Sequence, residues 1–255
     1  MLREHLIHKT AGDGKFRWRS HEVSRLEGLS DAVFAFAITL LVVSLEVPRT
    51  FTELFEIMRG FVPFAVCFTM LYQIWYSQFI WFRRYGMQDT TAVTLNGVLL
   101  FVVLFYVYPL KFLFTYLLNV IMGGQGMVRL PNGRTEPMLQ GADIYAMMVV
   151  YDAGFIAVFA VFVLLYFHAW RKRDELVLNA DERFETIRRL GANACMAGVS
   201  LLSLAVVLIG GMKTAGWAGM LYFLIGPTLT VYHSVMGRRK RKADEQASLA
   251  GLPLS

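Results

Sequence analysis

The apolar residues of this 255-residue chain fall in six long blocks, and this arrangement limits its possible folds more than any other feature. Hydrophobic residues make up 56% of the sequence, and short charged segments separate the blocks. A helix needs roughly 20 apolar residues to cross a bilayer core of about 30 Å. We therefore predict an all-α membrane protein with six transmembrane helices per subunit. The blocks cover residues 27–48, 60–82, 92–119, 142–170, 191–212 and 215–236.

Lys and Arg are distributed unevenly among the segments that join these blocks. Nineteen of the 25 lie in the N-terminal segment, the loops at 83–90 and 171–190, and the tail, whereas five lie in the other loops. Positive charge marks the cytoplasmic side of membrane proteins, so both termini are predicted to be cytoplasmic. Basic flanks beside anionic lipid also account for the net charge of +6, and we expect no nucleic acid as a partner.

The chain divides into three parts. We assign residues 1–24 to a basic cytoplasmic N-terminal segment, 25–237 to the six-helix membrane domain, and 238–255 to a basic cytoplasmic tail that is expected to be disordered. Its two cysteines, Cys67 and Cys195, lie inside apolar blocks, where a thiol behaves as a small hydrophobic group. The spacing of histidine, cysteine and carboxylate residues matches no metal site, and we predict neither a metal nor a cofactor.

Two ionisable residues, Lys111 and Asp152, lie inside the third and fourth blocks. Counted from the external ends of these blocks, they sit about eight and about ten residues deep. A charged group in hydrocarbon is costly unless it is paired or hydrated. We expect the two side chains to pair or to meet through water. The alternative is that Lys111 extends to the membrane interface while Asp152 faces a hydrated crevice.

The first block carries unusual polarity for a membrane helix. With the two residues before it, the block reads RLEGLSDAVFAFAITLLVVSLEVP (residues 25–48). Fourteen residues separate Asp31 from Glu46, which corresponds to about 21 Å of helix. That length is shorter than the hydrocarbon core of a bilayer. Ser24 followed by Glu27 fits a capping box, which would start the helix in the cytosol.

A helical projection divides the first block into three faces. A small and polar face indicates a helix inside a bundle, where one side meets other helices or water. Such a helix could line a path through the membrane. The small and polar face contains Gly28, Asp31, Ala35, Thr39, Val42 and Glu46, the adjoining face Phe36, Leu40, Val43 and Val47, and the bulky apolar face Phe34, Ile38, Leu41 and Leu45.

The first block also resembles the signature helix of a known membrane-protein family. That signature has Arg, three further residues, Phe-Ser-Asp, and an Ala- and Ile-rich run that ends in Leu-Glu and Pro. The match makes this chain similar to the transmembrane protein 175 family, the potassium channels of lysosomes and of many bacteria. Six blocks and one copy of the motif look like the bacterial form. Further matching positions are Trp75, Asn96 and Pro109.

The resemblance implies a homotetramer in which the four first helices surround a central pore. It places the pore constriction at Phe36, Leu40 and Val43, with Thr39 as a polar pore residue. Rings of apolar side chains can gate by dewetting, and four copies of Glu46 near the external mouth would raise the local cation concentration. Family members usually carry isoleucine where this chain has Phe36.

The resemblance further implies a hydrogen-bond network that joins the cytoplasmic halves of the first three helices. The sequence departs from the family pattern at Leu29, which replaces the motif phenylalanine, and at Gln78 and Phe79, which replace histidines. The network residues are Arg25, Ser30, Asp31, Trp75 and Asn96.

These patterns favour a potassium-permeable cation channel that is not an enzyme. We expect a homotetramer in the lipid bilayer of a bacterial cell membrane, with potassium and other monovalent cations as permeant ions. The sequence has no Gly-x-Ser-x-Gly elbow and no phosphate-binding glycine loop. Other interpretations remain open. One is a proton- or ion-coupled transporter with a relay of Asp31, Lys111 and Asp152, and another is a membrane enzyme that assembles Asp31, Asp152 and His168, or a scaffold without transport.

Overall fold

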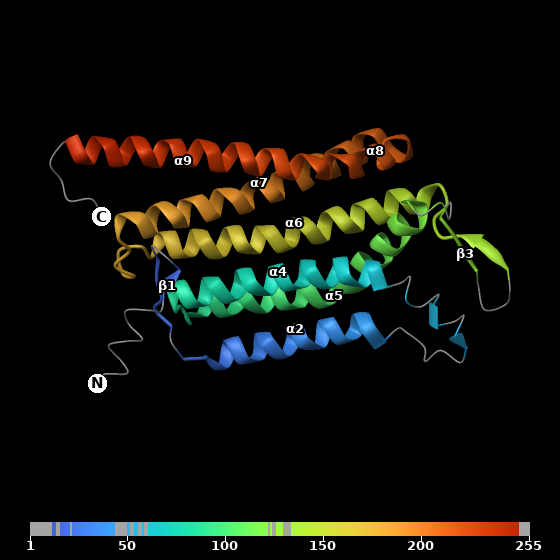
Figure 1. Ribbon diagram of the computed structural model, residues 1–255, viewed down its shortest axis with the longest axis horizontal. Coiled ribbons are helices and arrows are strands. Elements are labelled where there is room, and N and C mark those ends of the chain that lie inside the picture. Colours follow the sequence, from blue (N-terminus) through green and yellow to red (C-terminus); the bar gives the residue numbers. More distant parts are fainter. Residues whose placement is uncertain are drawn as a thin grey trace.

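The computed structural model of the chain is an elongated bundle of long helices that run along a common axis (Figure 1). It describes residues 12–13, 16–20, 22–43, 50–51, 54–55, 58, 61–121, 123, 126–129 and 134–249. The long helices are α2 (Arg25–Val43), α4 (Phe61–Tyr85), α5 (Thr90–Ile121), α6 (Ala142–Arg171), α7 (Ala180–Gly210) and α9 (Ile225–Leu249).

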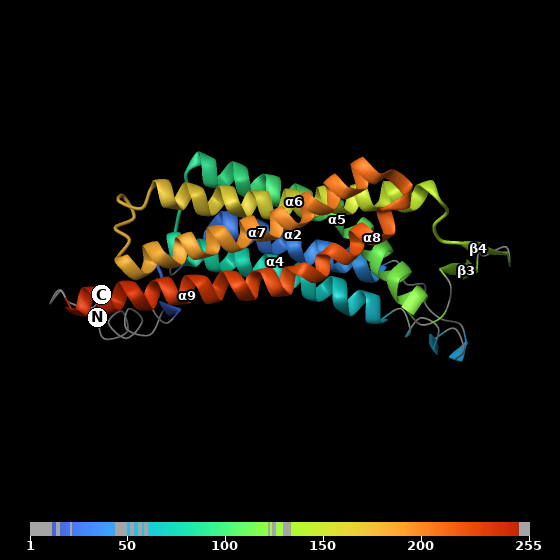
Figure 2. The same cartoon turned by 90° about the horizontal axis from the view of Figure 1, so that it is seen from above.

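Short elements complete the described part of the chain. Two antiparallel hairpins lie at opposite ends of the bundle, and a series of short helices joins α7 to α9 (Figures 1 and 2). The hairpins are β1 (Gly12–Asp13) with β2 (Phe16–Arg17), and β3 (Met127–Arg129) with β4 (Thr135–Pro137). The short helices are the 3-10 helix η1 (Gly211–Lys213), α8 (Ala215–Met220) and the 3-10 helix η2 (Leu221–Leu224).

Three helices in the described residues are long and apolar enough to cross a membrane, namely α5, α6 and the stretch Ala180–Lys213 that contains α7. The chain is therefore a mostly helical protein with membrane-spanning helices. Its most basic segments, around β2, the α4–α5 and α6–α7 links and the C-terminal half of α9, lie at one end of the bundle (Figure 1).

The sixth predicted helix, residues 215–236, is not a single α-helix. The 3-10 helix η2 lies between α8 and α9, and the residues at both of its ends keep helical backbone dihedrals. Gly211, with a φ of 61°, terminates α7 in a backbone conformation that favours glycine. Pro227 accounts for the 3-10 interruption, because its ring would clash with the carbonyl of residue 223 in a continuous α-helix. In the first turn of α9 the missing N–H of Pro227 needs no helical partner.

The tail prediction is wrong for residues 238–249, which continue α9 to Leu249 instead of being disordered. The side chain of Lys240 forms an ion pair with Asp181 of α7 and lies 5.4 Å from the ring centre of Phe184. These contacts hold the basic end of α9 against α7. Helix α7 also begins earlier than the fifth predicted block, at Ala180, after a capping box formed by Asn179 and Glu182.

Close packing of α6 against α5 and α7 forms the centre of the bundle, and α2 packs on α4 and α5. Gly154 on α6 permits the approach of α5, because a Cβ atom there would lie 2.2 Å from the Tyr106 ring. The buried core includes Phe34 and Leu41 of α2 and Trp81 of α4. Helix α2 is thus fixed to the bundle along one face.

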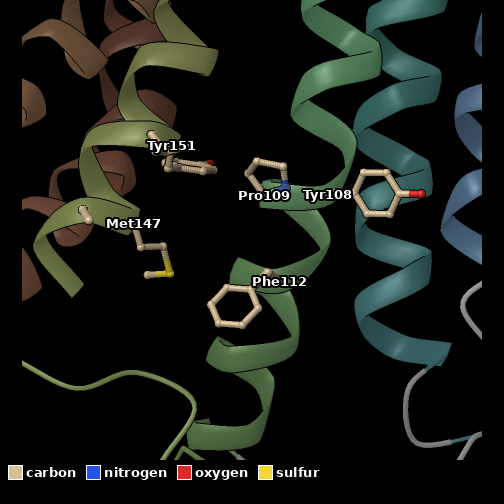
Figure 3. Close-up of a pocket in the computed structure, with 7 residues that line it drawn as sticks. Tyr108, Pro109, Phe112, Met147 and Tyr151 are labelled. Carbon is tan, nitrogen blue, oxygen red and sulfur yellow. The ribbon is translucent and has the colours of Figure 1, made fainter. Parts of the chain in front are cut away.

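Helix α5 continues through Pro109, and an apolar hollow of about 400 Å³ lies beside this residue. Pro109 and Phe112 of α5 face Met147 and Tyr151 of α6 across it (Figure 3). The lining contains no charged side chain, so the hollow offers no group that would attract an ion.

Candidate functional site

Helix α2 begins with the predicted capping box. The backbone N–H of Glu27 donates to Ser24 Oγ at 3.2 Å, and the Ser24 N–H donates to Glu27 Oε2 at 2.8 Å. This reciprocal pair satisfies two N–H groups that the helix itself leaves unbonded. Arg83 of α4 lies 3.8 Å from the other carboxylate oxygen of Glu27. The start of α2 is therefore fixed in register and tied to α4.

The two faces of α2 differ sharply in exposure. Phe34, Ala37 and Leu41 are buried against the neighbouring helices, with exposed fractions of 2%, 0% and 1%. The opposite face contains Phe36, which is 57% exposed, and the exposed Thr39. The described members of the predicted polar stripe, Gly28, Asp31, Ala35 and Thr39, therefore lie on the free face of α2, together with Phe36 from the adjoining stripe.

The predicted constriction residues differ in their surroundings. Leu40 is half-buried and packs against the hydrophobic core, whereas Phe36 is exposed and does not belong to the residues packed against it. Val43 is the last residue of α2, and its side chain lies outside the described part of the chain. Glu46 also lies outside the described residues. The hydroxyl of Thr39 donates to the carbonyl of Phe36 at 2.7 Å, so its oxygen can still act as an acceptor.

A buried chain of amide and hydroxyl groups joins α2, α4 and α5. Gln78 of α4 donates from Nε2 to Oδ1 of Asn96 on α5. Asn96 donates from Nδ2 to Ser30 Oγ on α2 at 2.9 Å, and Ser30 donates to the carbonyl of Leu26 at 2.8 Å. Ser30, Asn96 and Gln78 are all almost fully buried. Buried polar groups need such partners, so the chain fixes the relative depth of the three helices.

Asp31 and Trp75 form a second link between α2 and α4. The indole Nε1–H of Trp75 donates to Asp31 Oδ1 at 2.7 Å. Four of the five expected network residues are thus hydrogen-bonded as two separate links. The fifth, Arg25, is exposed, and its side chain makes no hydrogen bond or ion pair with the described residues. Gln78 belongs to the buried link although the sequence marked it only as a departure from the family pattern.

The predicted direct pair of Lys111 and Asp152 is not formed. Asp152 receives hydrogen bonds at 2.6 Å from the Tyr222 hydroxyl and at 3.1 Å from the Ser203 hydroxyl. Lys111 donates to the carbonyl of Leu41 at 2.6 Å. A similar depth in the membrane does not bring the two side chains together, because Lys111 faces α2 whereas Asp152 faces α7 and η2. The carboxylate of Asp152 finds its partners in hydroxyl groups instead.

His168 lies in yet another environment, at the end of α6. Its Nε2 is 2.7 Å from Oδ2 of Asp89, just before α5. Asp31, Asp152 and His168 therefore belong to three separate sets of contacts, and the membrane-enzyme alternative has no assembled site. The relay of Asp31, Lys111 and Asp152 is likewise not assembled.

The N-terminal segment forms a strap, residues 16–20, across the basic end of the bundle, which was not expected. Arg19 forms an ion pair of 2.6 Å with Glu182 of α7, and the two side chains are 12% and 1% exposed. Arg19 also donates to the carbonyls of Leu176 and Arg84, at 3.1 and 3.2 Å. The ring of Phe16 packs edge-on against Tyr85, with ring centres 5.5 Å apart. The strap thus connects α4, α7 and the α6–α7 link.

Glu182 and Glu185, two glutamates beside this strap, are held ionised by arginines. Both lie in residues 180–190 of α7, ahead of its apolar stretch. Burial raises the pKa of Glu185, but the hydrogen bonds from Arg188 and Arg189 outweigh it and lower the pKa to about 2. Burial also raises the pKa of Glu182, and bonds from Arg19 and backbone N–H groups bring it below its ordinary value. Both carboxylates therefore stabilise this end of the bundle as anions.

The bundle contains helices that can cross a membrane, and its first helix has one buried face and one free polar face. These features place the protein in the class of α-helical membrane proteins. Residues 25–106 match the family model described as the endosomal/lysosomal potassium channel TMEM175. A potassium channel from Marivirga tractuosa is 40% identical over 230 residues, which cover 89% of this chain and 93% of that protein. The chain belongs to the TMEM175 family.

Further relatives agree in sequence and fold. A potassium channel from Chamaesiphon minutus is 28% identical over 172 residues, or 64% of this chain and 73% of that protein. The crystal structure of a variant of the potassium channel MtTMEM175, in complex with a nanobody–MBP fusion, superposes with a TM-score of 0.77. It is 39% identical and matches 89% of this chain and 99% of that chain. A Chamaesiphon minutus homologue of the lysosomal potassium-selective channel TMEM175, 22% identical with a TM-score of 0.51, shares the fold over 85% of this chain and 99% of its own.

Proposed function

We propose that the protein is a potassium-permeable cation channel in which four copies of the chain surround a central pore. The free face of α2 lines this pore. The observation that carries the proposal is the exposure of Asp31, Phe36 and Thr39 on one side of a helix whose other side is buried. Membership of a family whose relatives are named potassium channels supports the same conclusion.

The free face of α2 is poorly suited to lipid. Thr39 and Asp31 would place a hydroxyl and a carboxylate in the hydrocarbon or at its edge, which is unfavourable without water or a polar neighbour. The small side chains of Ala32 and Ala35 on the same face would let other helices or water approach closely. Four such faces around an axis would provide a hydrated path for an ion.

Within this path, Phe36, Leu40 and Val43 form the narrowest part of the proposed pore. An apolar constriction conducts only when it is wetted, so its side chains set the barrier to ions. The exposed ring of Phe36 is free to point towards the axis. Thr39 offers oxygen lone pairs to a partly dehydrated cation, because its proton is already donated to the carbonyl of Phe36.

The proposed orientation places both termini in the cytoplasm of a bacterial cell. The four most basic segments lie at one end of the bundle, and positive charge favours the cytoplasmic side. Six membrane crossings per subunit then follow, with the interrupted segment from α8 to α9 as the sixth. Glu46, at the opposite end of the proposed pore, would attract cations to the external mouth.

An ion-flux assay tests this function. The purified protein, with its oligomeric mass measured in detergent, is reconstituted into liposomes, and the initial rates of K⁺, Na⁺ and Cl⁻ flux are compared with those of empty liposomes. We expect a mass of four subunits, flux of K⁺ well above the empty control, and no flux of Cl⁻. Chloride flux equal to potassium flux, or tetramers that pass no cation, would overturn the proposal.

A further inference from the structure

A second cavity, separate from the free face of α2, lies between α4, α5, α6, α7 and α9. Its volume is about 350 Å³, within the range of roughly 300–1,000 Å³ typical of small-molecule sites. Both Gln73 of α4 and His233 of α9 line it and are exposed, so the cavity opens to the surroundings between these two helices. We call it the α4–α9 crevice.

The lining of the α4–α9 crevice changes from polar to apolar along its length. Apart from Gln73 at the opening, the amide, serine, arginine and histidine side chains of the lining gather near the basic end of the bundle, where α7 enters its apolar stretch. Deeper in the bundle the walls are aliphatic and aromatic. The polar end contains Ser77, Arg189, Asn193 and His233, and the apolar part contains Met70, Leu110, Phe155, Val158, Phe159 and Met196.

The polar end of the crevice carries excess positive charge. Three arginines share the carboxylate of Glu185, with N–O distances of 2.6 Å for Arg188, 3.0 Å for Arg189 and 3.4 Å for Arg84. Three guanidinium groups and one carboxylate leave this cluster with a net positive charge. Helix α9 continues from His233 into the basic run 238–242 at the same end of the bundle. An anionic group is therefore the best electrostatic match for this end.

The walls of the crevice are set by tight helix packing. A Cβ atom at Gly191 of α7 would lie 2.0 Å from the hydroxyl of Tyr232 on α9, so glycine lets the two helices meet here. This contact fixes α9 beside the first turns of α7, with His233 next to Tyr232 at the mouth. Asn193 is oriented by donating from Nδ2 to the carbonyl of Arg189 at 2.8 Å. The polar end is thus a built arrangement of groups on two packed helices.

We propose that the α4–α9 crevice binds an acidic phospholipid. The anionic phosphate lies against Arg189, Asn193 and His233, and one acyl chain extends along the apolar walls formed by α4, α5 and α6. Each half of the lining recognises one half of such a molecule. A soluble anion would leave the apolar walls uncovered, and a neutral lipid would leave the positive charge without a partner. The inference concerns lipid binding and does not depend on ion conduction.

Native mass spectrometry of the full-length protein tests the proposal. The probes are dioleoylphosphatidylglycerol and dioleoylphosphatidylcholine, which have the same acyl chains and differ in net charge. We expect phosphatidylglycerol to bind at least about fivefold more tightly. Arg189→Gln should weaken its binding about fivefold, whereas Lys172→Gln, which removes a cation of the α6–α7 link outside the crevice, should leave it within about twofold.

The apolar half of the crevice provides a second test. Met196→Trp, which fills the crevice, should reduce retention of phosphatidylglycerol severalfold, whereas Leu202→Trp on an exposed part of α7 should not. This comparison tests lipid binding in the crevice even if Arg189→Gln fails to fold. Inorganic phosphate should not displace the lipid. Equal binding of the two lipids, equal effects within either pair of variants, or displacement by phosphate would overturn the proposal.

Discussion

Thr39 and Thr69 each donate a hydrogen bond to a backbone carbonyl of the preceding helical turn, on different helices. Thr39 on α2 donates to the carbonyl of Phe36 at 2.7 Å, and Thr69 on α4 donates to that of Ala65 at 2.8 Å. Both side chains are exposed. Only Thr39 lies on the face that is proposed to line the pore. Comparing the same substitution at both positions therefore distinguishes an effect on ion conduction from an effect on the helix itself.

Replacing the hydroxyl of Thr39 should therefore change conduction. Thr39→Val keeps the shape of the side chain but removes the oxygen that faces a permeant ion, and we expect the K⁺ flux and its ratio to Na⁺ flux to fall severalfold in liposomes. Thr39→Ser should retain most of both. The matched change Thr69→Val should leave flux unaltered, and an equal loss from the two valine variants would contradict the role of Thr39.

The indole of Trp75 gives a prediction about stability. Trp75→Phe removes the donor to Asp31 and should lower the free energy of unfolding by about 1 kcal/mol, since hydrogen bonds to a partly exposed carboxylate are modest. Thermal unfolding in detergent measures this change. Trp217→Phe on α8 is the control, because Trp217 is 71% exposed. No difference between the two variants would show that the Asp31–Trp75 link contributes little.

Single residues also mark where the sequence was informative and where it was not. The capping box of Ser24 and Glu27 was predicted because it depends on neighbours three residues apart, and it is confirmed. The pairing of Lys111 with Asp152 was predicted from depth alone. Depth does not say which way a side chain faces, and the two residues lie on different sides of the bundle.

At the scale of elements, the strap and the start of α7 show how charged segments stabilise one end of the bundle. Arg19 binds the carboxylate of Glu182 and the carbonyls of the α6–α7 link. Val177 in this link has a φ of 48°, which is unusual for a β-branched residue, and Arg19 lies within 3.4 Å of its carbonyl. The strap therefore holds a strained turn in place.

Glu182→Gln should destabilise the protein through this contact. Leaving Arg19 partly buried without its counter-ion should cost about 3 kcal/mol, measured by thermal unfolding. Because the folded pKa of Glu182 lies below its unfolded value, the difference from wild type is fully present above a pH of about 4.3. It should shrink as the pH falls further. Glu175→Gln, at an exposed ion pair with Lys172, should have no measurable effect.

The elements that sequence reasoning placed least well are those fixed by tertiary contacts. The ends of α4, α5 and α6 lie within a few residues of the predicted blocks, because hydrophobicity alone specifies them. The helical continuation of α9 to Leu249 depends on the pair of Lys240 with Asp181, which is invisible in a hydrophobic pattern. Pro227 was the available signal for the interruption of the sixth segment.

At the scale of the whole molecule, a network around Asp152 joins α6, α7 and the interrupted segment between α8 and α9. Besides the two hydroxyl groups on its carboxylate, Ser203 Oγ lies 3.2 Å from the carbonyl of Ala218 in α8. Tyr222 and Ser200 are also within 2.7 Å of each other. The network holds the interrupted helix against the bundle, which is a structural role and not that of an ion relay.

The substitution Asp152→Asn distinguishes a structural role of Asp152 from a role in an ion relay. The amide of asparagine can accept a hydrogen bond from Tyr222 and donate one to Ser203, so we expect folding and K⁺ flux close to wild type. Asp152→Leu would leave both hydroxyl groups without this partner and should cost about 3 kcal/mol in thermal unfolding. Loss of cation flux in a stable Asp152→Asn protein would favour the transporter alternative.

The central claim is that the free face of α2 lines a cation pore, and the K⁺ flux of Phe36→Ala tests it most directly. Phe101→Ala on α5 is the matched control, since Phe101 is 71% exposed and Phe36 is 57% exposed. With equal amounts of tetramer in liposomes, we predict that Phe36→Ala raises the initial K⁺ flux severalfold by lowering the apolar barrier, and that Phe101→Ala matches wild type. Equal flux through wild type and both variants would contradict the account.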